Sequence, residues 1–265
     1  MDDPFFLVDP DGGLAISLMA FNSCAHGMNN LEKALVQRRT DGAILGSYRT
    51  TVAQELAEFI LLDSQQGFFM PPGNDPSFPL SAKLYEITHY EINMNGGGTY
   101  YKPTIWQAND IIDDLEKRVA EVGRTQIRIP TSQLIRGEIL RAFQASIGRK
   151  EQGAAVAHMK LAVGMLEAGA KKWQSLPFAE KGMLFKPTFA RGARVYLLNC
   201  LIRASRDATT PSAKRMFPLE TVEQLAHKIS KENPESSWPP HAGEATPTAY
   251  HMKPAWEAYS ALAYF

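Results

Sequence analysis

Apolar residues recur at steps of three and four along most of this chain, which is the spacing of one face of an α-helix. The clearest case is residues 104–122, where Ile112, Leu115 and Val119 follow one another at these steps. Gly123 is expected to end this helix, because glycine is common just beyond a helix C-terminus. The pattern predicts an amphipathic helix with a narrow apolar seam.

From Pro130 to about residue 232 the pattern predicts only helices. The helix predicted at 188–206 contains a stretch, 195–202, that is apolar nearly all round, so we expect it to lie deep in the core. The other helical patterns cover residues 51–66, 132–147, 154–166 and 218–229.

Residues 83–94 have a different pattern. Tyr85, Ile87 and His89 alternate with the residues of the opposite face, and aromatic and β-branched residues are frequent, which predicts a strand. The expected fold is therefore mainly α: a compact helical core with a small β-strand element near 83–94 and extended N- and C-terminal arms.

Proline and charge divide the chain into four predicted parts. Residues 1–13 form an N-terminal arm, and residues 14–123 form an acidic part with helices and the strand. A basic helical core follows at 124–232, and residues 233–265 form a proline-rich, aromatic C-terminal arm.

Composition narrows the class of protein. With 45% hydrophobic and 21% charged residues the chain is typical of a globular protein. The two cysteines, Cys24 and Cys200, are too far apart in sequence to indicate a disulfide framework. Neither a signal-peptide pattern nor an apolar run long enough for a bilayer is found, so we expect a soluble, intracellular, cytoplasmic protein without a membrane partner.

The net charge of zero conceals two opposite parts. Residues 117–215, here called the basic segment, contain nineteen Lys and Arg but only six Asp and Glu, a net charge of +13. The rest of the chain has a net charge of −13. Such a segment suits a polyanion, and its spread over about a hundred residues favours neutralisation of a phosphate backbone over base-specific readout.

Arginines of the helix at 188–206 are the strongest candidates within this segment. Arg191 and Arg194 fall near its start, where the helix dipole disfavours a cation by about 0.3–1 kcal/mol, so they need an anionic partner. We expect that changing both to Glu abolishes nucleic-acid binding and leaves the fold intact. The candidate nucleic-acid-binding residues are Arg191, Arg194, Arg203, Arg206, Arg136, Arg141, Arg149 and Lys150.

Two interpretations of the basic segment remain open. Its cations can line a groove for single-stranded nucleic acid, with RNA favoured, or they can be neutralised by the acidic part within one fold. Aromatic residues of the segment can stack bases if they are exposed, but they are more often core residues. These are Trp173, Phe178, Phe185 and Tyr196.

An iron-dependent enzyme is a third possibility. On a strand, His89 and Glu91 point to the same face, and His158 can supply a second imidazole. This layout resembles that of iron- and 2-oxoglutarate-dependent oxygenases, which implies that the Arg203 region holds a co-substrate carboxylate. The chain departs from the family in having Glu in place of the usual Asp, in placing His158 within a helical pattern and in lacking the many strands of the fold.

Both termini are apolar and arm-like, at residues 5–8 and 256–265. A helical core with a basic cleft and two arms resembles viral nucleoproteins and filamentous coat proteins in general plan. Short stretches at 102–104 and 209–215 are similar to ones in the coat proteins of flexible filamentous plant viruses, but they cover under a tenth of the chain and assign no family. The leading hypothesis is a non-enzymatic nucleic-acid-binding packaging protein that self-associates through its arms and needs no cofactor. The alternative is a helical scaffold or adaptor that binds other proteins.

Overall fold

A computed structural model describes residues 13–33, 37–38, 44–45, 52–62, 80–94, 107–232 and 258–263. Residues 1–12 and most of 233–265 lie outside this part, so the two expected arms are described only at 258–263. Those six residues are helical, and they bury Ala258 and Ala261.

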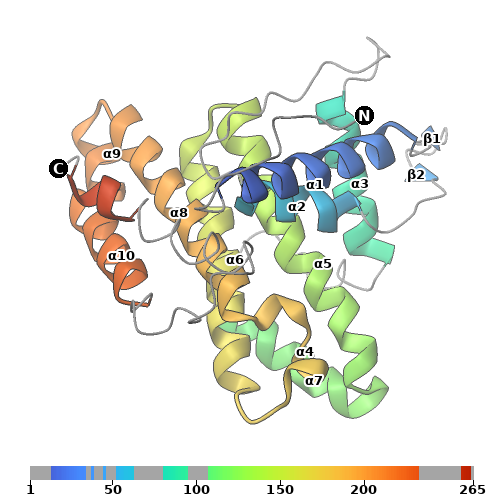
Figure 1. The fold of residues 1–265 in the computed structure, drawn as a ribbon. Helices are drawn as coiled ribbons and strands as arrows, with labels where there is room; N and C mark the ends of the chain where they lie inside the picture. Colours follow the sequence, from blue (N-terminus) through green and yellow to red (C-terminus); the bar gives the residue numbers. More distant parts are fainter. Residues whose placement is uncertain are drawn as a thin grey trace.

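The described residues are mainly helical, as the sequence predicts (Figure 1). A two-residue antiparallel ladder, β1 (Gln37–Arg38) with β2 (Ile44–Leu45), is the described strand pairing. The helices of the first half are α1 (Gly13–Lys33), α2 (Val52–Leu62), α3 (Leu80–Met94), α4 (Ala108–Val122) and α5 (Arg124–Phe143). Those of the second half are the π-helix η3 (Gln144–Gly148), α6 (Gln152–Lys172), α7 (Phe178–Lys181), the 3-10 turn η4 (Met183–Phe185), α8 (Pro187–Asp207), α9 (Pro211–Met216) and α10 (Leu219–Lys231).

The strand predicted at 83–94 is wrong, because these residues lie in α3. The buried positions of α3 are Leu84, Ile87, Thr88, Glu91 and Ile92, which is a helical stripe with steps of three and one. Two of its five members are polar, so the hydropathy of the sequence does not reveal this stripe. Thr88 can be buried because its hydroxyl donates to the Leu84 carbonyl at 2.8 Å, within the same helix.

Helix α5 begins directly after Gly123, whose φ of 85° separates it from α4. It continues through Pro130, which lies in its second turn and removes one early backbone hydrogen bond. Thr131 donates its hydroxyl to the Ile127 carbonyl inside the helix, so α5 runs unbroken through this proline.

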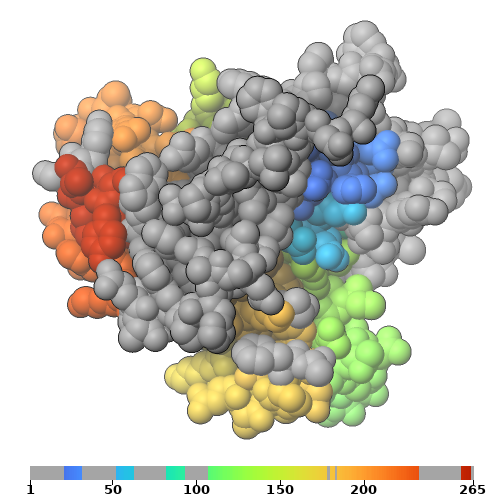
Figure 2. Space-filling model, in the orientation of Figure 1, coloured from blue at the N-terminus to red at the C-terminus, as the bar shows by residue number. Residues whose placement is uncertain are grey.

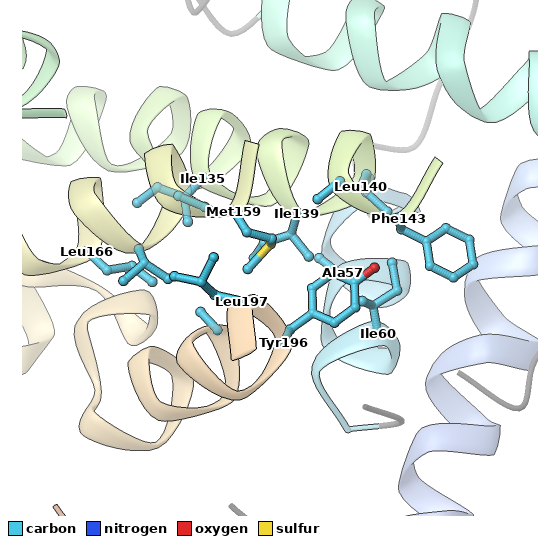
Figure 3. Packing of buried hydrophobic residues seen from close by; sticks show 14 of the residues in the cluster. Ala57, Ile60, Ile135, Ile139, Leu140, Phe143, Met159, Leu166, Tyr196 and Leu197 are labelled. Carbon is cyan, nitrogen blue, oxygen red and sulfur yellow. The ribbon is translucent and has the colours of Figure 1, made fainter. Parts of the chain in front are cut away.

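The core is built around α2, α5, α6 and α8, as the close view in Figure 3 shows. Ile139 of α5, Met159 of α6 and Tyr196 of α8 are fully enclosed there. The prediction that 195–202 lies deep in the core is confirmed, since most side chains of this stretch are buried. Around this centre, α1 packs on α2, α3 on α5, α4 on α5 and α6, and α10 on α8.

The acidic part, 14–123, and the basic core, 124–232, share this hydrophobic centre. Helix α2 packs on α5 and α8, and α4 packs on α5 and α6. The boundary at Gly123 is thus a corner between two packed helices. Throughout the described residues, no helix combines the length and the apolar character that a membrane span requires.

Candidate nucleic-acid interface

The eight candidate cations fall into two groups of four. Arg136, Arg141 and Arg191 are buried, and Arg194 is largely enclosed, each in contact with carboxylate or carbonyl oxygens. The other four are Arg149, Lys150, Arg203 and Arg206, which lie at least partly exposed.

Arg191 and Arg194 take part in a network that joins three helices. Arg194 Nε donates to Glu167 of α6 at 3.0 Å, and its Nη1 donates to the carboxylate of Glu232, just beyond α10, at 2.7 Å. Arg191 Nη2 donates to the Glu232 backbone carbonyl at 2.9 Å. Lys228 adds a second contact to Glu167 at 2.7 Å. The anionic partners that these arginines require are therefore supplied by the basic core itself.

The pKa of Glu167 reflects this network. Burial raises the pKa of the carboxyl, but hydrogen bonds from Lys228 and Arg194 and their positive charges outweigh it, so the pKa lies below its usual value. Because α8 starts at Pro187, Arg191 lies in its second turn, where the dipole effect is weaker than the sequence prediction assumes.

Arg136 and Arg141 also belong to internal contacts. Arg136 pairs with Glu58 of α2 at 3.2 Å and lies over the Phe189 ring at 5.8 Å. Arg141 pairs with Glu138 at 2.6 Å, and both side chains are almost completely buried. The expected neutralisation by the acidic part thus occurs at Glu58, whereas other buried arginines are neutralised within the basic core.

The exposed group gathers where η3, α6 and α8 meet. Arg203 of α8 lies 3.5 Å from the Ser146 hydroxyl of η3, and Arg149 and Lys150 directly follow η3. Helix α9 joins them, because Phe217 at its end lies against Gly153 near the start of α6. We call this surface the basic edge; its cations are Arg149, Lys150, Arg203, Arg206, Lys214 and Arg215.

Cations outnumber acids in the sequence stretches that form the basic edge. Its six cations have two acidic neighbours in sequence, Glu151 and Asp207, both exposed. Figure 2 shows α9 and α10 in orange at one end of the molecule, away from the blue surface of α1. An anionic polymer lying along this end can meet several cations at once.

The backbone of the basic edge is unusual in two ways. The π-helical turn η3 ends α5, and π-helical turns are frequent at functional sites. Lys150 then adopts a φ of +57°, the one positive φ among the described non-glycine residues, which costs about 1–2 kcal/mol relative to the ordinary helical region. Such strain is concentrated at binding clamps in proteins, and here it falls on an exposed cation.

The aromatic candidates for base stacking are largely core residues. Tyr196, Trp173 and Phe185 are buried, and the side chain of Phe178 lies outside the described residues. The structure instead exposes Tyr85, which is 38% accessible and has the Arg149 guanidinium 5.6 Å from its ring centroid. Sequence reasoning assigned Tyr85 to a strand and missed it. No sequence signal could have found it, because the buried stripe of α3 that leaves Tyr85 outside is seen only in the structure.

The geometry expected for an iron site is absent from α3. His89 and Glu91 are two residues apart on a helix, so they point to different sides. Burial and the charge of Arg141 lower the pKa of His89, while His158 Nδ1 lies 2.7 Å from Glu138. Within the described residues, no three His, Cys, Asp or Glu side chains converge in a way that could hold a metal ion.

Comparisons of the chain with protein-family models, with curated proteins and with solved structures find no match.

Proposed function

We propose that the protein binds the phosphate backbone of nucleic acid through the basic edge, with little sequence preference, and that it packages the nucleic acid by self-association. The observation that supports this most is the collection of six cations from α8, α9 and the η3–α6 turn at one end of the fold. Their arginine forks and ammonium groups suit phosphate oxygens.

Low sequence preference follows from the same residues. Lys and Arg that contact phosphates position a nucleic acid but do not read its bases. The four enclosed arginines, by contrast, hold the helices together and are not part of the proposed contact surface. The interface is therefore smaller than the basic segment from which it was predicted.

The first test reverses three charges of the basic edge. The triple variant R149E/K150E/R206E is expected to bind a labelled single-stranded 20-mer at least about 100-fold more weakly than the unchanged protein at 0.1 M salt, because three phosphate contacts become repulsive. Fluorescence anisotropy measures the affinity, and circular dichroism verifies the fold.

A second triple variant, K117E/K160E/K171E, is the matched control. These three lysines are exposed and belong to α4 and α6, and their reversal changes the net charge equally. Lys171 lies about 28 Å along α6 from Gln152, at a rise of 1.5 Å per residue. Equal loss in both variants would show that overall charge matters and the basic edge does not, which would contradict the proposal.

Self-association through the termini is the second part of the proposal. It is supported by the apolar sequence at residues 5–8 and by the terminal helix at 258–263, which carries an exposed Tyr259 beside its buried alanines. Sedimentation velocity with and without nucleic acid is the measurement, and removal of residues 1–12 is expected to reduce the assembly. A monomer under all conditions would contradict this part.

A protein-binding scaffold is the alternative function. It is favoured by the internal pairing of four of the eight candidate cations and by apolar side chains exposed around α9, where Met216 and Leu219 are accessible. A monomer that retains no nucleic acid at low salt is the result expected for a scaffold.

A further inference from the structure

We infer that Tyr85 and Arg149 form a stacking platform for an unpaired base, so that the basic edge prefers single strands to duplexes. This inference rests on the proposed function and specifies its ligand. A phosphate-binding edge alone accepts either form of nucleic acid, whereas an exposed aromatic ring beside it adds an interaction that only an accessible base can make.

The inference rests on the position of Tyr85. Helix α3 buries one stripe of side chains against the core, and Tyr85 lies outside that stripe. The ring contacts His89 edge-on at 4.6 Å between centroids, and Arg149 covers it at 5.6 Å. Tyr85 is thus held on the rim of the basic edge while more than a third of its surface remains accessible.

Core packing does not explain this arrangement. A tyrosine that serves the core buries its ring, as Tyr196 does. The contact between Arg149 and Tyr85 involves an exposed guanidinium, and such cation–π contacts contribute only about 0.5–1 kcal/mol. A nucleobase can therefore replace the guanidinium on the ring, or stack on the guanidinium plane itself, at low cost.

The neighbouring cations complete the recognition of a single strand. Lys150 follows Arg149 directly, and Arg203 reaches the same turn through Ser146. When a base stacks on Tyr85, the phosphates on either side of that base lie next to these charges. In a duplex the bases are already stacked and paired, so the ring gains no partner and only the phosphate contacts remain.

The experiment compares three probes of equal length: single-stranded dT12, an abasic 12-mer and a 12-base-pair duplex. The unchanged protein is expected to bind dT12 about 5- to 150-fold more tightly than the abasic strand, the range expected for the stacking of a base on an aromatic side chain. Tyr85→Leu should bring dT12 to the level of the abasic strand, and Tyr85→Phe should keep the preference. Binding of the abasic strand should be equal for all three proteins.

The outcomes separate this inference from the proposed function. If Tyr85→Leu binds dT12 as tightly as the unchanged protein does, while R149E/K150E/R206E binds no probe, the platform is refuted and phosphate binding stands. If the unchanged protein binds none of the three probes at 0.05 M salt, both are refuted. Thermal unfolding of Tyr85→Leu ensures that a loss of binding is not a loss of fold.

Discussion

Glu91 is a carboxyl group enclosed by three helices. It lies on α3, faces Ala53 and Glu55 of α2 and Arg136 of α5, and is 1% exposed. Burial raises its pKa to about 7; Glu55 adds to this effect, whereas a backbone hydrogen bond from Ala53 and the charge of Arg136 oppose it. The folded protein therefore holds a proton on Glu91 that the unfolded chain releases near its ordinary pKa of 4.5.

The contribution of Glu91 to stability should fall as the pH rises through this interval. Between pH 4.5 and about 7 the unfolded state binds fewer protons at Glu91 than the folded state, so this group lowers the free energy of unfolding by roughly 3 kcal/mol, while the lowered pKa of His89 acts in the opposite direction below pH 6.5. Glu91→Gln removes this dependence and should be more stable than the unchanged protein at pH 8. Urea unfolding at pH 5 and pH 8 measures the difference.

Glu121→Gln is the control, since Glu121 is exposed at the end of α4. It should lose as much stability between the two pH values as the unchanged protein does. If Glu91→Gln behaves in the same way as Glu121→Gln, the buried carboxyl is not the source of the pH dependence.

At the scale of elements, α10 is held to α8 and α6 by a charged network as well as by its apolar side. Arg194 of α8 contacts Glu167 of α6 and Glu232 at the end of α10. This changes the expectation drawn from the sequence that Arg191 and Arg194 can be reversed without harm to the fold. Two added carboxylates would face Glu167 and Glu232 at close range.

Removal of the Arg194 charge should weaken the contact of α10 with α6 and α8. Arg194→Gln is expected to cost about 1–3 kcal/mol in unfolding free energy, because it leaves two partly enclosed carboxylates with fewer donors. Arg206→Gln, on the exposed end of the same helix, should cost less than about 0.5 kcal/mol. Chemical denaturation gives both values, and hydrogen exchange locates the change. Equal costs for the two variants would contradict a structural role for Arg194.

The helical class could be predicted from the sequence because apolar spacing dominates α4, α8 and α10. The identity of α3 could not, since Thr88 and Glu91 occupy buried positions and interrupt its apolar stripe. Two different contacts allow their burial: Thr88 donates to a carbonyl group of its own helix, whereas Glu91 faces elements that are distant in sequence. A hydropathy pattern reveals neither contact.

The candidate site was predicted with the same limits. The sequence identifies an excess of cations, but it does not reveal which of them meet carboxylates in the fold. Glu58 reaches Arg136 across 78 positions, and Glu232 reaches Arg194 across 38. Such long-range contacts, together with the local pair of Arg141 and Glu138, divide the candidates into an enclosed group and the basic edge.

For the whole molecule, the net charge of zero means that the proposed attraction to nucleic acid should depend on distance. At 0.1 M salt charges interact over about 10 Å, so a strand at the basic edge experiences mainly the cations there. At 0.01 M the range is about 30 Å, comparable to the length of α6, and the acidic remainder of the chain repels the strand as well.

The affinity should therefore respond to salt in two regimes. Above about 0.1 M, the logarithm of the binding constant should fall against the logarithm of salt with a slope near −4, the value for about six contacts to a single strand. Below about 0.03 M the curve should flatten. Anisotropy titrations from 0.01 to 0.5 M test this, and one straight line over the entire range would contradict the two-regime picture.

Gly137 of α5 lies where this helix packs closely on α3. A methyl group at this position would lie 2.5 Å from the end of the Ile92 side chain, which is itself buried. The absence of a side chain at Gly137 therefore allows α3 to pack closely on α5, and an added methyl group must displace either the Ile92 side chain or α3 itself. Because Tyr85 lies on the same helix, a displaced α3 would alter its position beside Arg149, and Gly137→Ala would then change the proposed binding surface without replacing any of its residues.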